Sequence, residues 1–190
     1  LTFDACSSRD HGRADRGVIE YLVRTRTPAT VFLGGKWMED EPAAARRLAE
    51  QPFLVRGTHG YMHDRPETLS DEAFRADLAR AIAAHRDLTG CTPALYRAPY
   101  AVHDDRVTRL AAGLGLTTVE YDLDSGDPDP AFDAVRLAGW VGREAHNGSI
   151  IVFHLNGRGW HTAEALPRIV RLLRARGLAL VTVSELLRRG

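Results

Sequence analysis

The sequence is poor in cysteine, carries no net charge and lacks a long apolar run, and each absence excludes a class of protein. Its 190 residues include only Cys6 and Cys91, which lie far apart without the close spacing of zinc ligands. A zinc knuckle is therefore excluded, and whether the two pair stays open. The 25 basic residues are balanced by 25 acidic ones, which argues against a nucleic-acid partner held mainly by phosphate contacts. No apolar run approaches a length of about 20 residues, so we expect no membrane span in this chain.

Two further signals are missing near the N-terminus. No glycine-rich phosphate loop follows the first apolar run, where Asp4-Ala5-Cys6-Ser7-Ser8 stands instead, and this argues against a dinucleotide-binding fold. The chain starts directly on Leu1-Thr2-Phe3, with no charged leader before it. We therefore expect a trimmed N-terminus, with any signal peptide or anchor lying upstream.

What the sequence does contain is an alternation of short apolar runs with stretches of helical period. With 44% hydrophobic and 26% charged residues, the chain can bury one ordinary core, so we expect residues 1–190 to form one domain. The alternation predicts βα units with right-handed crossovers and a largely parallel sheet. About seven such units closing on themselves give an α/β fold, a distorted (β/α) barrel, with an open doubly wound sheet as the main alternative. The expected strands are 1–3, 29–33, 53–55, 94–96, 117–121, 150–153 and 178–183.

Two helices are predicted most clearly. One covers residues 70–88, with Ser70 as its N-cap, acidic residues in its first turn and Gly90 just past its end. The other starts at Thr162 and keeps Pro167 in its early turns, where the missing N–H costs least.

Reactive side chains stand where the apolar runs end. Asp4, His59, Arg97, Asp124 and His154 each lie at or just past the C-terminal end of such a run. In a barrel this edge holds the active site, because the strand ends converge there while the helices wrap the outside. The pattern therefore predicts an enzyme.

A pair of histidines is the first candidate for metal chemistry. His59 and His63 are four residues apart, so a helical turn starting at His59 would put both rings on one face, where they can share a divalent cation such as zinc. Two solvated loop histidines are the alternative. Asp4 can bind a metal or deprotonate a metal-bound water, or it can be a turn aspartate. Arg97, followed by the proline-fixed turn of Pro99, can hold a catalytic carboxylate ionised, or it can be a surface arginine.

A second histidine site is expected at the end of the run 150–153. His154 can act as a general acid for a departing amine, with a partner carboxylate drawn from the segment 122–127, or it can be a hydrogen-bonded structural residue. Trp160 lies close behind and suits a sugar ring, although it can equally be packing. Among the remaining histidines, His85 is expected in the core and His103 and His146 are expected in solvent, while Asp10 and His11 occupy the loop after Asp4.

Taken in order, these residues resemble the polysaccharide deacetylases of the NodB-homology type, carbohydrate esterase family 4. The resemblance spans nearly the whole chain, because five motifs occur in sequence. They are Thr2-Phe3-Asp4, His59 to His63, Arg97 to Tyr100, Asp124 to Asp127 and Phe153-His154-Leu155.

The resemblance implies a distorted (β/α) barrel that removes acetyl groups from N-acetylated amino sugars with a divalent metal, expected to be zinc. It implies His59 and His63 as metal ligands and Asp4 as the general base, with Arg97 as the partner of Asp4. Two further roles concern the leaving group: His154 is the implied general acid, and Asp127 tunes it. The resemblance also implies that Tyr100 stabilises the oxyanion through its backbone N–H. Leu155 and Trp160 are further candidates for substrate contact.

Two departures from the family pattern bear on the site. The first motif usually has two consecutive aspartates, the second of which binds the metal, but Ala5 stands at that position. Asp4, Asp10 or His11 is then left to complete the site, or the metal is weak or absent. The fourth motif usually continues with tryptophan, whereas Pro128 follows Asp127 here.

Three functions remain in view at this point. The leading one is a metal-dependent deacetylase of peptidoglycan, chitin or a related glycan, working outside the membrane or at the cell envelope. The second is a catalytically weakened glycan-binding module, which Ala5 favours and the retained Asp4, Arg97 and His154 oppose. The third is a related hydrolase of small non-sugar amides.

Overall fold

A computed structural model describes residues 1–7, 12–102 and 104–189. Within them the chain forms one sheet of seven strands, and every pair of neighbouring strands is parallel. The order across the sheet is β5-β4-β3-β2-β1-β7-β6. The strands are β1 (Thr2–Ala5), β2 (Ala29–Leu33), β3 (Leu54–Thr58), β4 (Leu95–Tyr96), β5 (Thr117–Thr118), β6 (Leu123–Asp124) and β7 (Ile151–His154).

The strand order is that of a barrel opened at one seam. Each strand from β1 to β5 lies beside its predecessor, and β6 and β7 continue the same circuit back to β1. In the described part of the chain, β5 and β6 are the only consecutive strands without a shared ladder. A doubly wound sheet reverses its direction of winding, which this sheet does not do. The expected distorted barrel is therefore confirmed and the doubly wound alternative is wrong.

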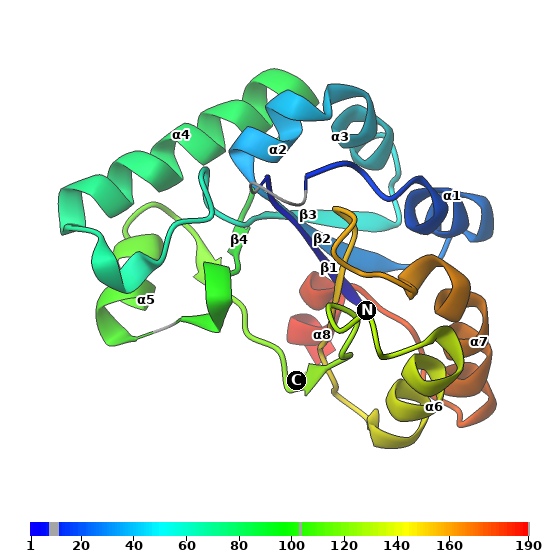
Figure 1. The fold of residues 1–190 in the computed structure, drawn as a ribbon. Helices are drawn as coiled ribbons and strands as arrows, with labels where there is room; N and C mark the ends of the chain where they lie inside the picture. The colour runs from blue at the N-terminus through cyan, green and yellow to red at the C-terminus, as the bar shows by residue number, and fades with distance from the viewer. Residues whose placement is uncertain (8–11, 103, 190) are drawn as a thin grey trace.

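Apart from α8, the helices form one outer layer around the sheet (Figure 1). Consecutive contacts join α6 to α7, α7 to α1, α1 to α3, α3 to α4 and α4 to α5, so the layer follows the strands around the circuit. The helices are α1 (Arg16–Thr25), α2 (Gly35–Asp40), α3 (Pro42–Ala49), α4 (Asp71–Thr89), α5 (Asp105–Ala112), α6 (Ala134–Glu144), α7 (Thr162–Ala175) and α8 (Val183–Arg189), with single 3₁₀ turns at Pro66–Thr68 and Pro99–Ala101.

The two helices predicted most clearly are confirmed. Helix α4 begins after Ser70, whose hydroxyl accepts the N–H of Ala73, and it ends at Gly90, which has a left-handed φ of 68°. Helix α7 begins at Thr162 and contains Pro167 in its second turn. His85, on the buried side of α4, is fully buried as expected.

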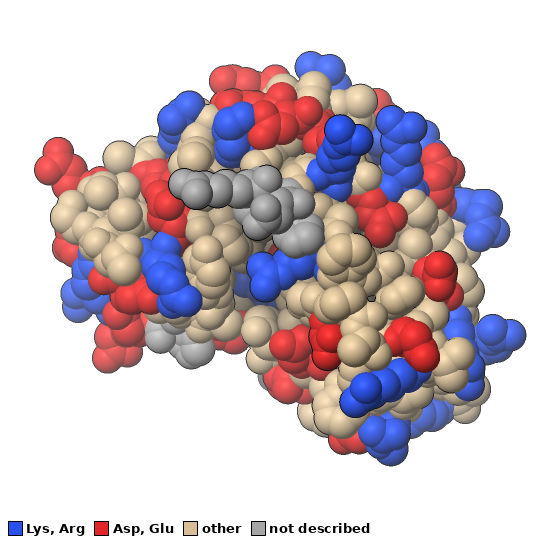
Figure 2. Space-filling model, in the orientation of Figure 1, with Lys and Arg blue, Asp and Glu red and all other residues tan. Residues whose placement is uncertain are grey.

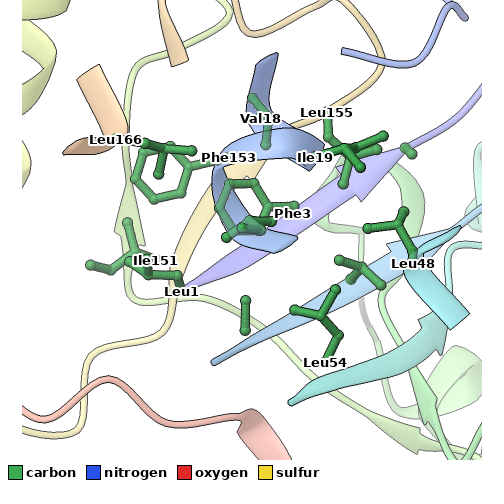
Figure 3. Close-up of a cluster of buried hydrophobic side chains, with 14 of the residues drawn as sticks. Leu1, Phe3, Val18, Ile19, Leu48, Leu54, Ile151, Phe153, Leu155 and Leu166 are labelled. Atoms are coloured by element: carbon green, nitrogen blue, oxygen red, sulfur yellow. The ribbon is translucent and has the colours of Figure 1, made fainter. Parts of the chain in front are cut away.

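Side-chain alternation along β1 separates the core from the site. Phe3 and Ala5 point toward the helices and pack in the main apolar core, which Figure 3 shows with Val18, Leu155 and Leu166 among its members. Successive strand residues point to opposite faces, so Thr2 and Asp4 point into the barrel. Asp4, the second-last residue of β1, thus faces the barrel interior.

Two strand predictions need correction. Residues 178–183 do not form a strand in the structure; they lead into α8, and Val183 packs inside the barrel against Phe32, Leu95 and Val119. Leu178 and Leu180 are half-buried against the main apolar core, whereas Val183 lies at the floor of the barrel, where its N–H donates to Thr30 Oγ1 at 2.9 Å. The seventh strand is instead β6, two residues within a polar segment that alternation did not reveal.

Charge is mixed over the molecular surface. In Figure 2, Lys and Arg side chains are interspersed with Asp and Glu side chains over the face that carries α4, α1 and α7 in Figure 1. This distribution gives no broad basic area on that face for a phosphate backbone. Among the described residues, no helix combines the length and apolarity required to cross a bilayer.

Candidate active site

The site is built at the C-terminal ends of the strands, around two residues that are neighbours in the sheet. Asp4 of β1 and His154 of β7 are register partners on adjacent parallel strands. Side chains at paired positions of parallel strands point to the same face, so both enter the mouth of the barrel. His59 follows β3 and Arg97 follows β4, which brings both to the same edge.

Arg97 holds Asp4 in a buried ion pair. Its Nη1 lies 2.9 Å from Oδ1 of Asp4 and donates to the hydroxyl of Thr2 at 2.7 Å. The guanidinium carbon lies 4.2 Å from the centroid of the Phe32 ring, and both ionic groups are almost fully buried. Burial raises the pKa of Asp4, but the charge and hydrogen bond of Arg97, together with the charges of His59 and His154, outweigh it and hold the pKa below its ordinary value. The structure thus brings together the predicted base and its predicted partner.

Asp127 is the carboxylate that holds His154. Its Oδ1 lies 2.8 Å from Nδ1 of His154, while its Oδ2 accepts the backbone N–H of His154 and the hydroxyl of Thr162, each at 2.7 Å. Burial lowers the pKa of His154, but the hydrogen bond and charge of Asp127, together with the charge of Asp4, outweigh it, so the pKa lies above its ordinary value. Asp124 is exposed and accepts the N–H of Gly126, so it is not the partner of His154.

The two histidines of the second motif are close, although not in a helix. Their ring centroids are 5.0 Å apart, and the segment that joins them has neither helical nor strand geometry, so the two rings come together without a helical turn. Nδ1 of His59 lies 2.9 Å from the carbonyl oxygen of Arg97, an arrangement that leaves Nε2 as the free acceptor. Burial lowers the pKa of His59, and burial together with His59 lowers the pKa of His63 to about 3.

These two rings supply some, but not all, of the ligands that a metal site requires. Neutral imidazoles whose second nitrogen is hydrogen-bonded to a carbonyl are typical zinc ligands, and His59 has this arrangement. Among the described residues, no third His, Cys, Asp or Glu completes a cluster with them. Ala5 packs in the apolar core, and Asp4 is engaged by Arg97. Asp10 and His11, the other candidates, lie outside the described residues.

The rim of the site carries two exposed aromatic side chains. Tyr100 is 50% exposed, and its ring centroid lies 4.6 Å from that of His63. Trp160, on the loop after β7, is 54% exposed, and its backbone N–H donates to the Asp127 carbonyl. Leu155 differs from these two, because its side chain is fully buried in the main core (Figure 3). The structure therefore does not place Leu155 on the rim.

Sequence reasoning missed several residues that support the site. The hydroxyl of Thr2 accepts a hydrogen bond from Arg97, and the hydroxyl of Thr162 donates one to Asp127. Asp77 of α4 accepts a backbone N–H from the segment between the two histidines. No local pattern marks these residues, since their partners are distant in the sequence. Cys6 and Cys91 are both free thiols. His146 is exposed beside Asp122, as predicted, and His103 lies outside the described residues.

Comparison with known proteins places this geometry in a family. The sequence profile of the polysaccharide deacetylase family matches residues 1–119 of the chain. A chitin deacetylase of Amylomyces rouxii is 27% identical over 182 residues, which cover 90% of this chain and 42% of that protein. The chain spans about half the length of the first two relatives that it matches.

Solved structures agree on the fold. A family 4 carbohydrate esterase from Streptomyces lividans, in complex with acetate, is 27% identical and has a TM-score of 0.82, covering 94% of this chain and 88% of that one. A family 4 pseudoenzyme from Bacillus anthracis is 24% identical and has a TM-score of 0.87, covering 98% of this chain and 64% of that one.

Proposed function

Because the chain belongs to the polysaccharide deacetylase family, we propose that it is a hydrolase that removes N-acetyl groups from the amino sugars of a glycan. One observation carries the proposal. Asp4 and His154 are register partners at the mouth of the barrel, and their neighbours shift their pKa values in opposite directions. Amide hydrolysis requires a base and an acid side by side, and here the carboxylate is biased toward its ionised form and the imidazole toward its protonated form.

The two side chains divide the proton transfers between them. Arg97 engages Oδ1 of Asp4, so Oδ2 is the oxygen that takes a proton from the attacking water. The water oxygen bonds to the acetyl carbon, and the C–N bond then breaks as Nε2 of His154 gives its proton to the departing nitrogen. Asp127 holds His154 through Nδ1, which directs Nε2 toward the substrate. The products are acetate and a free amine on the sugar. Donation from the Tyr100 backbone N–H to the developing oxyanion completes the proposed set.

His59 and His63 are the residues that would hold a divalent cation, for which we propose zinc. Bound there, the cation would polarise the acetyl carbonyl and lower the pKa of a coordinated water. Two protein imidazoles without a described carboxylate are a small ligand set for zinc, which in catalytic sites usually has three protein ligands. We therefore propose weaker metal binding than a three-ligand site provides.

The substrate class follows from the rim and from the relatives. Tyr100 and Trp160 expose apolar ring surface beside His63 and Asp127, as suits the face of a sugar. The relatives' names include chitin and peptidoglycan N-acetylglucosamine deacetylases. We propose an N-acetylglucosamine polymer of this kind as the substrate, and residues 1–190 as one catalytic domain. A domain acting on such a polymer would work outside the cell membrane or at the envelope.

A second candidate is a glycan-binding module that has lost turnover. Ala5 favours it, because a methyl group packed in the core stands where the family pattern has a carboxylate. The buried pairs Asp4–Arg97 and His154–Asp127 favour the hydrolase instead, since binding alone requires neither.

The two candidates are separated by acetate release. The purified chain would be stripped with a chelator, supplied with zinc and incubated with chitopentaose and, in parallel, with a small acetylated amide. We expect acetate from chitopentaose, greater with zinc than without, and a loss of about 100-fold or more in Asp4→Asn, because the isosteric amide cannot take the proton. Acetate from the small amide alone would reassign the substrate. Saturable binding of chitopentaose with no acetate above that of Asp4→Asn would establish the binding module.

A further inference from the structure

The segment that joins His59 to His63 lies outside any helix or strand, so contacts with other elements must define its shape. Gly60 has a φ of 74° and His63 has a φ of 58°, both in the left-handed region. Residues other than glycine seldom occupy this region, and such a conformation persists only where the surrounding structure imposes it. The position of the His63 ring therefore depends on what holds this segment.

A carboxylate on α4 holds the middle of the segment. Asp77 accepts the N–H of Tyr61 on Oδ2 at 2.8 Å and the N–H of Met62 on Oδ1 at 3.1 Å. These are adjacent amides between the two histidines, and each takes a different oxygen. A Cβ atom on Gly60 would lie only 3.0 Å from Oδ2 of Asp77, so the carboxylate fits directly against the glycine.

Helix α2 holds the same segment from its other side. The N–H of Gly35 donates to the carbonyl of Gly60 at 2.9 Å, and the N–H of Lys36 donates to the carbonyl of Tyr61 at 3.1 Å. Helix α2 therefore fixes the carbonyl groups while Asp77 fixes the amide groups. Removing the Asp77 carboxylate would leave the amides of Tyr61 and Met62 without these two acceptors.

We propose that Asp77 is a positioning residue, which sets the separation of the His59 and His63 rings through the backbone of Tyr61 and Met62. Its catalytic meaning rests on the proposed function, in which the two rings are metal ligands. A carboxylate that only tied α4 to the segment would contribute stability and leave the ring separation unchanged when removed.

The direct test is the ring separation in metal-free protein. Protons of the two rings, whose centroids are 5.0 Å apart, should give a nuclear Overhauser effect in the wild type. We expect this effect to be lost in Asp77→Ala and weakened in Asp77→Asn, since an amide offers one acceptor oxygen where the carboxylate offers two. Asp87→Asn, on the exposed side of the same helix, is the matched control and should preserve it. An undiminished effect in folded Asp77→Ala would overturn the proposal; should Asp77→Ala fail to fold, Asp77→Asn decides in the same way.

Zinc titration separates this proposal from the proposed function. Calorimetric titration of each variant with zinc should give an affinity for Asp77→Ala about 10-fold to 100-fold below that of the wild type, as is usual for residues that orient metal ligands. Asp87→Asn should match the wild type. Equal affinities in Asp77→Ala and wild type would overturn the positioning role and leave the metal pair standing. If the wild type bound no zinc, the metal assignment would fall, and the nuclear Overhauser effect alone would decide the role of Asp77.

Discussion

At the residue scale, the neighbour of each titratable group decides its charge. Asp4 and His154 are both buried at one mouth, and burial alone would favour the neutral form of each. Arg97 with His59 and His154 reverses this for Asp4, and Asp127 with Asp4 reverses it for His154. The neighbours therefore favour the charged form of both groups, in opposition to burial.

Replacing Asp127 tests this dependence. Asp127 and Asp4 raise the pKa of His154, while burial and Arg158 lower it. In Asp127→Asn the first of these is lost, so the pKa of His154 should fall and the alkaline limb of kcat/KM should move to lower pH. We expect kcat near pH 7.5 to drop by about 100-fold, at the lower end of what a positioned general acid contributes. A pH profile of acetate release measures both effects.

Asp124→Asn is the control for that substitution. Asp124 is exposed and lies three residues away, so its replacement should leave the alkaline limb in place. If the limb of Asp127→Asn coincided with that of the wild type, Asp127 would not be the group that raises the pKa of His154.

Much of this site could be predicted from the sequence, because strand ends carry its main residues. Asp4, His59, Arg97 and His154 follow apolar runs, and parallel strands bring such positions to one edge whatever the loops do. The contacts of Asp77 could not be predicted in this way. They join the middle of a helix to a segment of irregular backbone, and no periodic pattern in the sequence indicates that these two segments are in contact.

At the element scale, apolar runs and strands are not the same thing. The run at 178–183 has the composition of a strand, yet it ends on the barrel floor, where Val183 meets Phe32, Leu95 and Val119. Strand β6 has two residues among polar neighbours and is defined by its pairing with β7. Apolar composition reports burial, whereas strand formation also needs a free sheet edge at the right place.

The floor role of Val183 predicts a loss of stability without a loss of chemistry. Val183 is 3% exposed, so Val183→Ala should lower the free energy of unfolding by about 1–3 kcal/mol through lost burial and an incompletely filled cavity. Val183 meets the site only indirectly, through Phe32, whose ring also lies against Arg97, so kcat should change by no more than about twofold. Val135→Ala, at a valine that is 62% exposed, should change stability by less than about 0.5 kcal/mol. Denaturant unfolding compares the two, and equal small losses would contradict the floor assignment.

At the scale of the whole molecule, one circuit of strands separates a polar mouth from an apolar floor. The break between β5 and β6 leaves the barrel incomplete, and the outer helices follow the strands in a single layer. Buried titratable groups therefore occur both at the mouth and under this layer, where His85 lies between α4 and β2. Such groups link the stability of the whole fold to pH.

His85 makes the free energy of unfolding fall in acid. Its Nε2 donates to the carbonyl of Leu33 at 3.2 Å and its buried Nδ1 has no partner in the described residues, so the folded protein holds it neutral. Burial lowers its pKa from 6.5 to about 4, so between these values the unfolded chain binds a proton that the folded chain does not. Stability is then full above pH 6.5 and decreases toward pH 4, by about 2 kcal/mol for this group between pH 7 and pH 5. His63 acts in the same direction and His154 in the opposite one.

His85→Gln isolates that contribution, because glutamine can keep the donor to Leu33 but does not titrate. Denaturant unfolding at pH 7, 6 and 5 should show that the variant loses about 2 kcal/mol less than the wild type over this range, whatever its stability at pH 7. His146→Gln removes an exposed histidine and should keep the wild-type slope. If His85→Gln lost stability as steeply as the wild type, the buried imidazole would not be the acid-sensitive group, and the mouth histidines would have to account for the whole slope.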